Sequence, residues 1–340
     1  MINTITNESK IINRHLCILK NKNTIFYGDI KDCFSLSLPL KYTNVYTTKY
    51  NIWNQLYPYM YNNIQYNYKI SNQKNVELII YYWPKDKKEA LFHIQYLCSY
   101  DFIKCKILIT GNNRSGIKNA PKLLKSLISI QKLDTAKHSI LYLGTIQKKI
   151  IFTIKNTIKT YFLSNIKIKV FPGVFGYSGL DQGSLLLIST FSKKISGKIL
   201  DIGCGTGILS MMLYQKTSKV KLHLIDSNLI ALKSSKINLR INNIPGKLYP
   251  SDLFSNVNDK FDLILSNPPI HDGIQFTTLF IEKMIKESKK HLKPHGELRF
   301  VTPSGLMCQN LLKKYFIYHY ILLHKKKFIV YQGFDYKKTN

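Results

Sequence analysis

Arginine is scarce in this sequence, since only four of its fifty basic residues are Arg. Acidic residues are also few, and the formal net charge is +31. Clustered cations favour a nucleic-acid partner, because they release counterions when they meet phosphates. However, Lys, Ile, Asn and Tyr are all abundant, as expected from an A/T-rich genome. Charge alone therefore leaves a solvated lysine surface open as the alternative to RNA or DNA binding.

Paired cysteines and long apolar runs are also lacking. The six cysteines form no CxxC pair or regular framework, which argues against a structural zinc site and against a secreted disulfide scaffold. Lys, Asn or His interrupts every apolar run before it reaches the length of a membrane helix, and the N-terminus has no signal pattern. The sequence predicts a cytoplasmic protein with reduced thiols, no metal and no membrane association.

What is present is enough apolar sequence for two domains of ordinary size. From Lys167 onward, strand-like and helix-like segments alternate, which is typical of a doubly wound α/β sheet. The expected elements are strands at 198–201, 221–226, 261–266 and 297–301, helices beginning near 208, 229 and 278, a turn at 294–296, and a closing antiparallel pair at 315–323 and 327–331.

A glycine-rich loop, Asp201-Ile-Gly203-Cys-Gly205-Thr-Gly207, follows the first of these strands. Open α/β sheets bind ligands at the carboxyl ends of their strands, and glycines let the backbone lie against a ligand. The GxGxG spacing, with an acid two residues before the first glycine, favours S-adenosyl-L-methionine over the dinucleotides that GxGxxG loops bind. We expect Asp201, Gly203, Gly205 and Gly207 to contact this sulfonium cofactor.

Three further acids are candidates for the same cofactor. Asp226 ends the second strand, where its carboxylate would accept hydrogen bonds from both ribose hydroxyls, with a helix cap as the alternative. Asp252 follows the third strand and is placed to accept from the adenine amino group. Asp181, with Gln182 and Ser184, precedes the first strand and could close over the methionine end, although a capping loop is the alternative.

The strand at 261–266 runs into Asn267-Pro268-Pro269. Attack on a sulfonium methyl needs a nitrogen lone pair, which is delocalised in an aromatic or amide amine. The side-chain oxygen of Asn267 and the backbone carbonyl of Pro268 can accept the two N–H bonds and hold the nitrogen toward tetrahedral geometry. Pro268 and Pro269 stiffen the loop. A bare Asn-Pro-Pro is often only a turn, but its place after a strand and a glycine loop predicts a nitrogen methyltransferase.

The residues after the proline pair are candidates for substrate binding. Ile270 completes the catalytic motif, and Phe276 follows in the same loop. His271 and Asp272 could contact the substrate or assist proton loss. A purely structural role is the equal alternative for these two.

The N-terminal half repeats the same order of strand-like and helix-like segments, but the glycine and proline signals at their ends are weaker. This repetition suggests a duplication. The segment 25–29 stands in place of the first strand and loop but has one glycine, and Tyr82-Trp83-Pro84 stands where the other half has Asn267-Pro268-Pro269. We therefore expect residues 1–160 to form a degenerate methyltransferase-like domain without a cofactor site, and residues 161–340 the catalytic domain. An unrelated α/β domain is the alternative for the first half.

Together these motifs resemble the ribosomal RNA small subunit methyltransferase C family, which methylates a guanine N2 of 16S rRNA. The resemblance rests on segments 171–175, 179–181, 201–207 and 267–273, and in the first half on 81–85 and 111–116. It implies an α/β fold of two tandem class I (Rossmann-like) methyltransferase domains, the first degenerate and the second with a seven-stranded mixed sheet. It also implies a first domain that supports folding and binds RNA, and a monomer that acts on the 30S subunit at guanine 1207 in the family's usual numbering.

One position departs from the family pattern. Ile270 stands where the family usually has Phe or Tyr to stack on the extruded base, and such stacking contributes roughly 1–3 kcal/mol per base. We expect weaker base capture, with compensation from Phe276. Two alternatives share these motifs: a protein-glutamine or adenine-N6 methyltransferase, and an RNA-binding assembly factor that no longer turns over.

Overall fold

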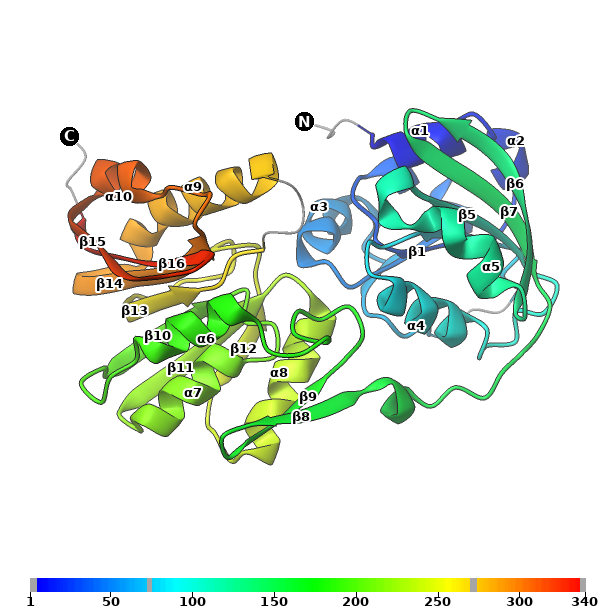
Figure 1. Cartoon of the computed structure of the whole chain (residues 1–340). Helices are drawn as coiled ribbons and strands as arrows, with labels where there is room; N and C mark the ends of the chain where they lie inside the picture. The colour runs from blue at the N-terminus through cyan, green and yellow to red at the C-terminus, as the bar shows by residue number, and fades with distance from the viewer. Residues whose placement is uncertain (1–4, 72–74, 270–273, 337–340) are drawn as a thin grey trace. The chain divides into compact units, whose positions relative to one another are not determined.

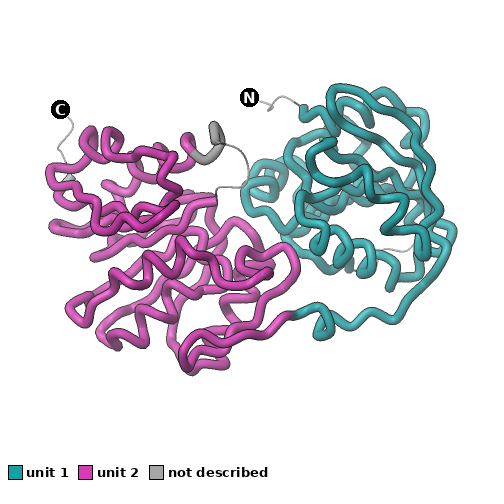
Figure 2. The backbone as a smooth tube through the Cα atoms, in the orientation of Figure 1, with its two compact units in different colours: residues 1–158 teal, residues 159–340 magenta. Residues whose placement is uncertain are grey.

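The computed structural model describes residues 5–71, 75–269 and 274–336, without the side chains of 274–277 and 336. The chain divides into two compact units, at Met1–Ile158 and Lys159–Asn340 (Figure 2).

Unit 2 is built around a seven-stranded sheet in the order β12-β11-β10-β13-β14-β16-β15. The strands from β12 to β14 are parallel, whereas β16 pairs antiparallel with both β14 and β15. The sheet is therefore mixed, as expected. Its strands are β10 (Gly197–Ile202), β11 (Val220–Asp226), β12 (Lys247–Pro250), β13 (Phe261–Ser266), β14 (Leu292–Pro303), β15 (Phe316–Lys325) and β16 (Phe328–Tyr336).

Helices cover both faces of this sheet (Figure 1). The helices α6 and α7 contact each other, and α9 contacts α10. Apolar side chains of α9 and α10, such as Met284 and Leu312, share one buried cluster with Leu200, Phe300 and Tyr331 of the strands. A separate hairpin, β8 (Lys159–Leu163) with β9 (Ile166–Val170), precedes the sheet. The helices are α6 (Gln182–Ser189), α7 (Ile208–Lys216), α8 (Leu229–Ile241), α9 (Ile274–His291) and α10 (Gln309–Tyr315).

Unit 1 contains a second seven-stranded sheet, in the order β3-β2-β1-β4-β5-β7-β6. Successive side chains of its central strands enter opposite clusters, so that Tyr81 packs with α4 and Tyr82 with α1 and α3. Both faces are thus buried, which explains the continuous apolar runs of β1 and β4. The elements are α1 (Asn7–Asn13), α2 (Leu16–Leu19), β1 (Thr24–Gly28), β2 (Thr43–Thr47), α3 (Tyr50–Met60), β3 (Ile64–Tyr66), β4 (Leu78–Tyr82), α4 (Lys87–Leu97), β5 (Lys106–Asn112), α5 (Ala120–Leu124), β6 (Ile128–Ala136) and β7 (Ser139–Ile146).

The two sheets have one topology. When the strands of each are numbered from their own first strand, both orders read 3-2-1-4-5-7-6. This identity confirms two Rossmann-like domains and contradicts an unrelated architecture for the first half.

Two sequence expectations for unit 2 were wrong. The segment 294–296 is not a turn before a new strand but lies within β14, where the pairing with β13 shifts register between Phe261 and Leu263. His295 has a φ of 60° in this irregularity, so a local bulge absorbs the Pro-His-Gly sequence. The last strand also continues five residues beyond the expected end at 331, because β16 pairs along the full length of β15.

Candidate functional site

The candidate site lies at the carboxyl edge of the unit 2 sheet. The last residue of β10, Ile202, pairs with Ile225 of β11 and with Ser266 of β13. This register brings the glycine loop between Asp226, which ends β11, and Asn267, which follows β13. The sheet therefore gathers three of the sequence motifs at one edge, where open α/β sheets bind ligands.

The glycine loop has the backbone and the space that a ligand site requires. Gly203, Gly205 and Gly207 all have positive φ, at 66°, 55° and 78°. A Cβ added to Gly203 would meet no described atom within 4 Å, and one on Gly205 would only touch Phe175 at 4.0 Å. On Gly207 it would lie 3.2 Å from both Leu224 and Ser235. Gly203 and Gly205 thus face an open pocket, whereas Gly207 packs against the fold and precedes α7.

The pocket combines the glycine loop with segments that precede β10. Sequence reasoning missed two aromatic side chains in its wall, Tyr161 from β8 and Phe175. The only signal for Phe175 was its place in the family-like segment 171–175. The lining residues are Tyr161, Phe175, Gly176, Gly179, Leu180, Asp181, Ser184, Gly203, Cys204, Gly205, Thr206, Ile208, Leu209 and Asn267.

Asn267 lies in the wall of this pocket with its amide orientation fixed by two acceptors. Its Nδ2 donates to Asp181 Oδ2 at 2.9 Å and to Ser184 Oγ at 2.8 Å. An ionised carboxylate only accepts hydrogen bonds, so the amide nitrogen must face Asp181 and the amide oxygen must point away from it. Both amide protons are used in this clamp, which leaves Oδ1 as the group that Asn267 can offer to a ligand.

The clamp is built on the first turn of α6. Asp181 caps this helix, because its Oδ2 also accepts from the Ser184 backbone N–H at 2.8 Å. The contact from Asp181 to Asn267 was not foreseen from the sequence, which suggested a role over the cofactor or as a cap. Pro268 is buried and Pro269 is exposed, consistent with a stiff loop leaving the sheet edge.

Asp201 ties the end of β10 to the first turn of α7. Its side chain is fully buried, and its Oδ2 accepts from the Ser210 hydroxyl at 2.7 Å and from the Ser210 backbone N–H at 3.3 Å. Burial raises the pKa of Asp201 to about 6, with the hydrogen bonds from Ser210 acting in the opposite direction. Its Oδ1 has no hydrogen-bond partner among the described residues. A direct contact from Asp201 to a cofactor stays a prediction.

Asp226 holds the loop from the side of β11. Its Oδ2 accepts from the Gly205 N–H at 3.0 Å and its Oδ1 from the Asn228 N–H at 2.8 Å. The cap of α8 is Asn228, whose side chain accepts from Ile230 N–H, so the helix-cap alternative for Asp226 is wrong. The carboxylate is partly exposed.

The structure does not place the remaining candidate residues in the pocket. Asp252 follows β12 and is half-buried, and its backbone N–H donates to Ser255 Oγ at 3.0 Å. It is not among the residues that line the pocket. Ile270, His271 and Asp272 lie outside the described residues, as does the side chain of Phe276.

The corresponding edge of unit 1 carries different residues. A Cβ on Gly28, which ends β1 with a φ of 96°, would lie 2.3 Å from the Tyr82 carbonyl oxygen and 2.8 Å from the Tyr81 ring. Trp83 follows β4 where Asn267 follows β13, and it is only 4% exposed.

The residues that the structure describes include no candidate membrane helix and no candidate metal cluster. Among them, no helix has the length and apolar character needed to cross a membrane. Within the same ranges, no group of three or more His, Cys, Asp or Glu side chains is arranged to hold a metal ion.

Comparison with known proteins covers both units. Residues 165–332 match the family described as Methyltransferase small domain, and residues 9–161 match Methyltransferase small domain N-terminal. The Ribosomal RNA small subunit methyltransferase C of Buchnera aphidicola subsp. Acyrthosiphon pisum is 46% identical, covering 97% of this chain and 99% of the relative. The protein of that name from Haemophilus influenzae is 37% identical, over 96% and 98%.

A solved structure shows the same two-domain fold. The T. thermophilus 16S rRNA N2 guanine-1207 methyltransferase, in complex with AdoMet and guanosine, aligns with a TM-score of 0.79 at 16% identity, covering 92% of this chain and 88% of that one. The matches confirm the fold class and an S-adenosyl-L-methionine-dependent methyltransferase. The chain belongs to the ribosomal RNA small subunit methyltransferase C family.

Proposed function

We propose that this protein transfers the methyl group of S-adenosyl-L-methionine to the exocyclic N2 of a guanine in 16S rRNA, at guanine 1207 in the family's usual numbering. It acts on the 30S subunit as a cytoplasmic monomer. Residues 161–340 carry the reaction, and residues 1–160 support folding and bind RNA. The names of the relatives and the guanosine in the solved T. thermophilus complex support this assignment.

The observation that carries the proposal is the fixed amide of Asn267. Because Asp181 and Ser184 take both amide protons, the oxygen is the one polar atom that Asn267 can present. This oxygen and the Pro268 carbonyl accept the two N–H bonds of the guanine amine. They draw the nitrogen out of conjugation and aim its lone pair, so no strong base is required.

The open glycine loop is the place that fits the cofactor. The space beside Gly203 and the positive φ of Gly203 and Gly205 support a ligand lying against the backbone there. When bound, the cofactor supplies an electrophilic methyl group on a sulfonium. Asp226 binds its ribose hydroxyls, and Asp252 accepts from its adenine amino group. Asp201 contacts it through Oδ1, or acts only by holding the loop through Ser210.

The substrate side of the site is less aromatic than is usual in the family. Ile270 gives the flipped guanine an apolar surface, and Phe276 adds to it from the same segment. His271 and Asp272 bind polar edges of the base. The smaller surface of Ile270 weakens base capture without removing activity.

The test is methyl transfer from labelled cofactor to 30S subunits that lack the modification, followed by nucleoside analysis. We expect N2-methylguanosine as the product, with the label mapping to guanine 1207. N6-methyladenosine, or methylated glutamine in a ribosomal protein, would reject the proposal in favour of another enzyme with the same motif. Cofactor binding without any transfer would favour a non-catalytic assembly factor.

A further inference from the structure

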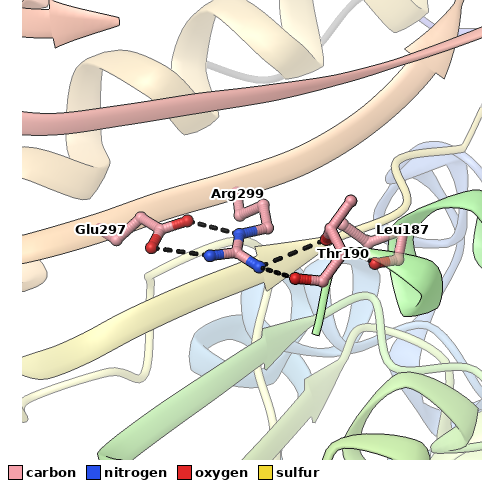
Figure 3. Close-up of polar contacts among 4 residues, drawn as sticks. All are labelled: Leu187, Thr190, Glu297 and Arg299. Atoms are coloured by element: carbon pink, nitrogen blue, oxygen red, sulfur yellow. Dashed lines mark hydrogen bonds and ion pairs between the residues drawn. The ribbon is translucent and has the colours of Figure 1, made fainter. Parts of the chain in front are cut away.

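A buried arginine lies on β14, and its guanidinium donates four hydrogen bonds. Arg299 is 7% exposed. Its Nε and Nη2 donate to the two carboxylate oxygens of Glu297 at 2.5 and 2.9 Å, and its Nη1 donates to the carbonyl oxygen of Thr190 at 2.9 Å and to Thr190 Oγ1 at 3.2 Å (Figure 3). A buried charge is costly unless it is paired and hydrogen-bonded, and this arrangement satisfies both conditions.

Thr190 is the residue that ends α6. It is the C-cap of this helix, and its hydroxyl also donates to the Leu187 carbonyl at 2.7 Å. The carbonyls at a helix C-terminus lack partners within the helix and carry partial negative charge, so a cation is favourable there. Arg299 therefore anchors the last turn of α6 to the central part of the sheet.

The other end of the same helix holds Asn267. Asp181 caps α6, Ser184 lies in its first turn, and both accept from the Asn267 amide. The eight residues of α6 span about 12 Å at 1.5 Å per residue, so one short rigid helix links the two ends. No described hydrogen bond joins Arg299 to Asn267, but each of them is bonded to one end of α6.

We infer that Arg299 is a positioning residue for methyl transfer. By fixing the C-terminus of α6, it sets where Asp181 and Ser184 stand, and thereby the direction in which Asn267 Oδ1 points. Glu297 acts with it by orienting the guanidinium. The inference rests on the proposed function, because it assigns to Arg299 the placement of the amine acceptor.

The first experiment replaces Arg299 by Lys. Lys keeps the charge but cannot bind Glu297 through two nitrogens and Thr190 through a third. We expect kcat to fall about tenfold, equivalent to about 1.4 kcal/mol, while KM for the cofactor changes less than twofold. Unchanged kcat, or a rise in cofactor KM with kcat retained, would overturn the inference.

Lys293→Met is the matched control. Lys293 also belongs to β14 and forms an ion pair with Asp262 at 2.7 Å, but no bond described links it to α6. The Lys293→Met variant should lose this ion pair and keep kcat.

If Arg299→Lys unfolds, Glu297→Gln is the milder variant, because it retains one acceptor for the guanidinium. We expect kcat of Glu297→Gln to fall about threefold. A fall as large in Lys293→Met as in these variants would contradict the inference.

A double-mutant cycle separates positioning from general stability. Ser184→Ala removes one acceptor of the clamp, so Arg299→Lys should reduce kcat less in that background than in the wild type. Additive losses in kcat would mean that Arg299 acts elsewhere.

The last readout does not require turnover. In ¹⁵N-labelled protein, the Asn267 side-chain NH₂ signal, assigned by its loss in Asn267→Ala, should exchange with solvent slowly in wild type and at least tenfold faster in Arg299→Lys. Equal exchange would overturn the inference even if the enzyme is active. Absence of N2-methylguanosine with wild-type enzyme would instead reject the proposed function, whatever the exchange rates are.

Discussion

Unit 1 and unit 2 have the same strand order, but they differ at the edge where unit 2 has its pocket. In unit 2, Gly203 faces open space and a half-buried Asn267 follows the fourth strand. In unit 1, the ring of Tyr81 lies against Gly28, and a buried Trp83 follows the fourth strand. A shared topology therefore leaves the chemistry open, and the side chains at one sheet edge decide it.

The residues at the two sheet edges also contribute to different properties, stability in unit 1 and function in unit 2. Tyr81 and Trp83 belong to the apolar core of unit 1 together with Ile109. Large side chains that fill the edge of unit 1 contribute to packing, whereas the glycines and polar groups of unit 2 leave space for ligands. Four predictions test this contrast.

Asn267→Ala should have the largest effect. It removes one of the two proposed amine acceptors, and the loss of one preorganised group at a reacting centre typically costs 10²–10³-fold in kcat. Folding and cofactor affinity should stay nearly intact. Trp83→Phe is the counterpart in unit 1 and should lower stability but leave kcat unchanged. Single-turnover kinetics measure both, and equal activity of Asn267→Ala would refute the site.

Asp201 should make the stability of unit 2 depend on pH. Its pKa is about 6 in the folded chain against an ordinary 3.8, so between about pH 4 and 6 the folded state holds more protons than the unfolded state. Asp201 therefore lowers the unfolding free energy of unit 2 by about 3 kcal/mol as pH rises through this window, and its contribution does not change above it.

Asp201→Asn should remove this slope. Amide exchange in β10, corrected for its intrinsic pH dependence, reports unit 2. Both tryptophans, Trp53 and Trp83, lie in unit 1, so their fluorescence reports the other unit in the same sample. A β10 slope that persists in Asp201→Asn would show that another group titrates.

Gly203→Ala should raise the KM for the cofactor by tenfold or more. The added methyl enters the space beside the loop, at a φ of 66° that costs an L-residue about 1–2 kcal/mol. Gly116 of unit 1 has a φ of 77° and equally open surroundings, so Gly116→Ala brings similar strain. Thermal unfolding should show similar losses for the two variants. If both changed KM equally, strain rather than cofactor contact would be responsible.

Asp226→Ala should have the smallest effect, a rise of about fivefold in the KM for the cofactor. It removes the proposed ribose acceptor and the partner of the Gly205 N–H. Asn228→Ala is its control, since it removes the cap of α8 and should cost about 1 kcal/mol of stability with little change in KM. The opposite pattern would make Asp226 a structural residue.

The sequence predicted the elements of unit 2 that have clear boundary residues, and the motifs at its sheet edge. Strands such as β10 and β13 are short apolar runs that end at Gly203 or at Asn267, so local signals suffice. Local signals failed at β14, where a bulge absorbs Pro294 to Gly296 and only the partner strand determines the pairing.

Tertiary contacts within the site were also beyond sequence reasoning. Asp181 and Asn267 are far apart in the sequence, and their hydrogen bond depends on where α6 packs. The anchoring of that helix by Arg299 depends on the same packing. Sequence patterns identify which groups are available, whereas the fold decides which of them meet.

Calorimetric titration of the full chain with S-adenosyl-L-methionine tests the contrast between the two edges most directly. One cofactor should bind per chain, and Asp226→Ala should weaken that single site. A stoichiometry of two, or binding that survives Gly203→Ala and Asp226→Ala combined, would contradict the claim that only the second unit kept an open edge.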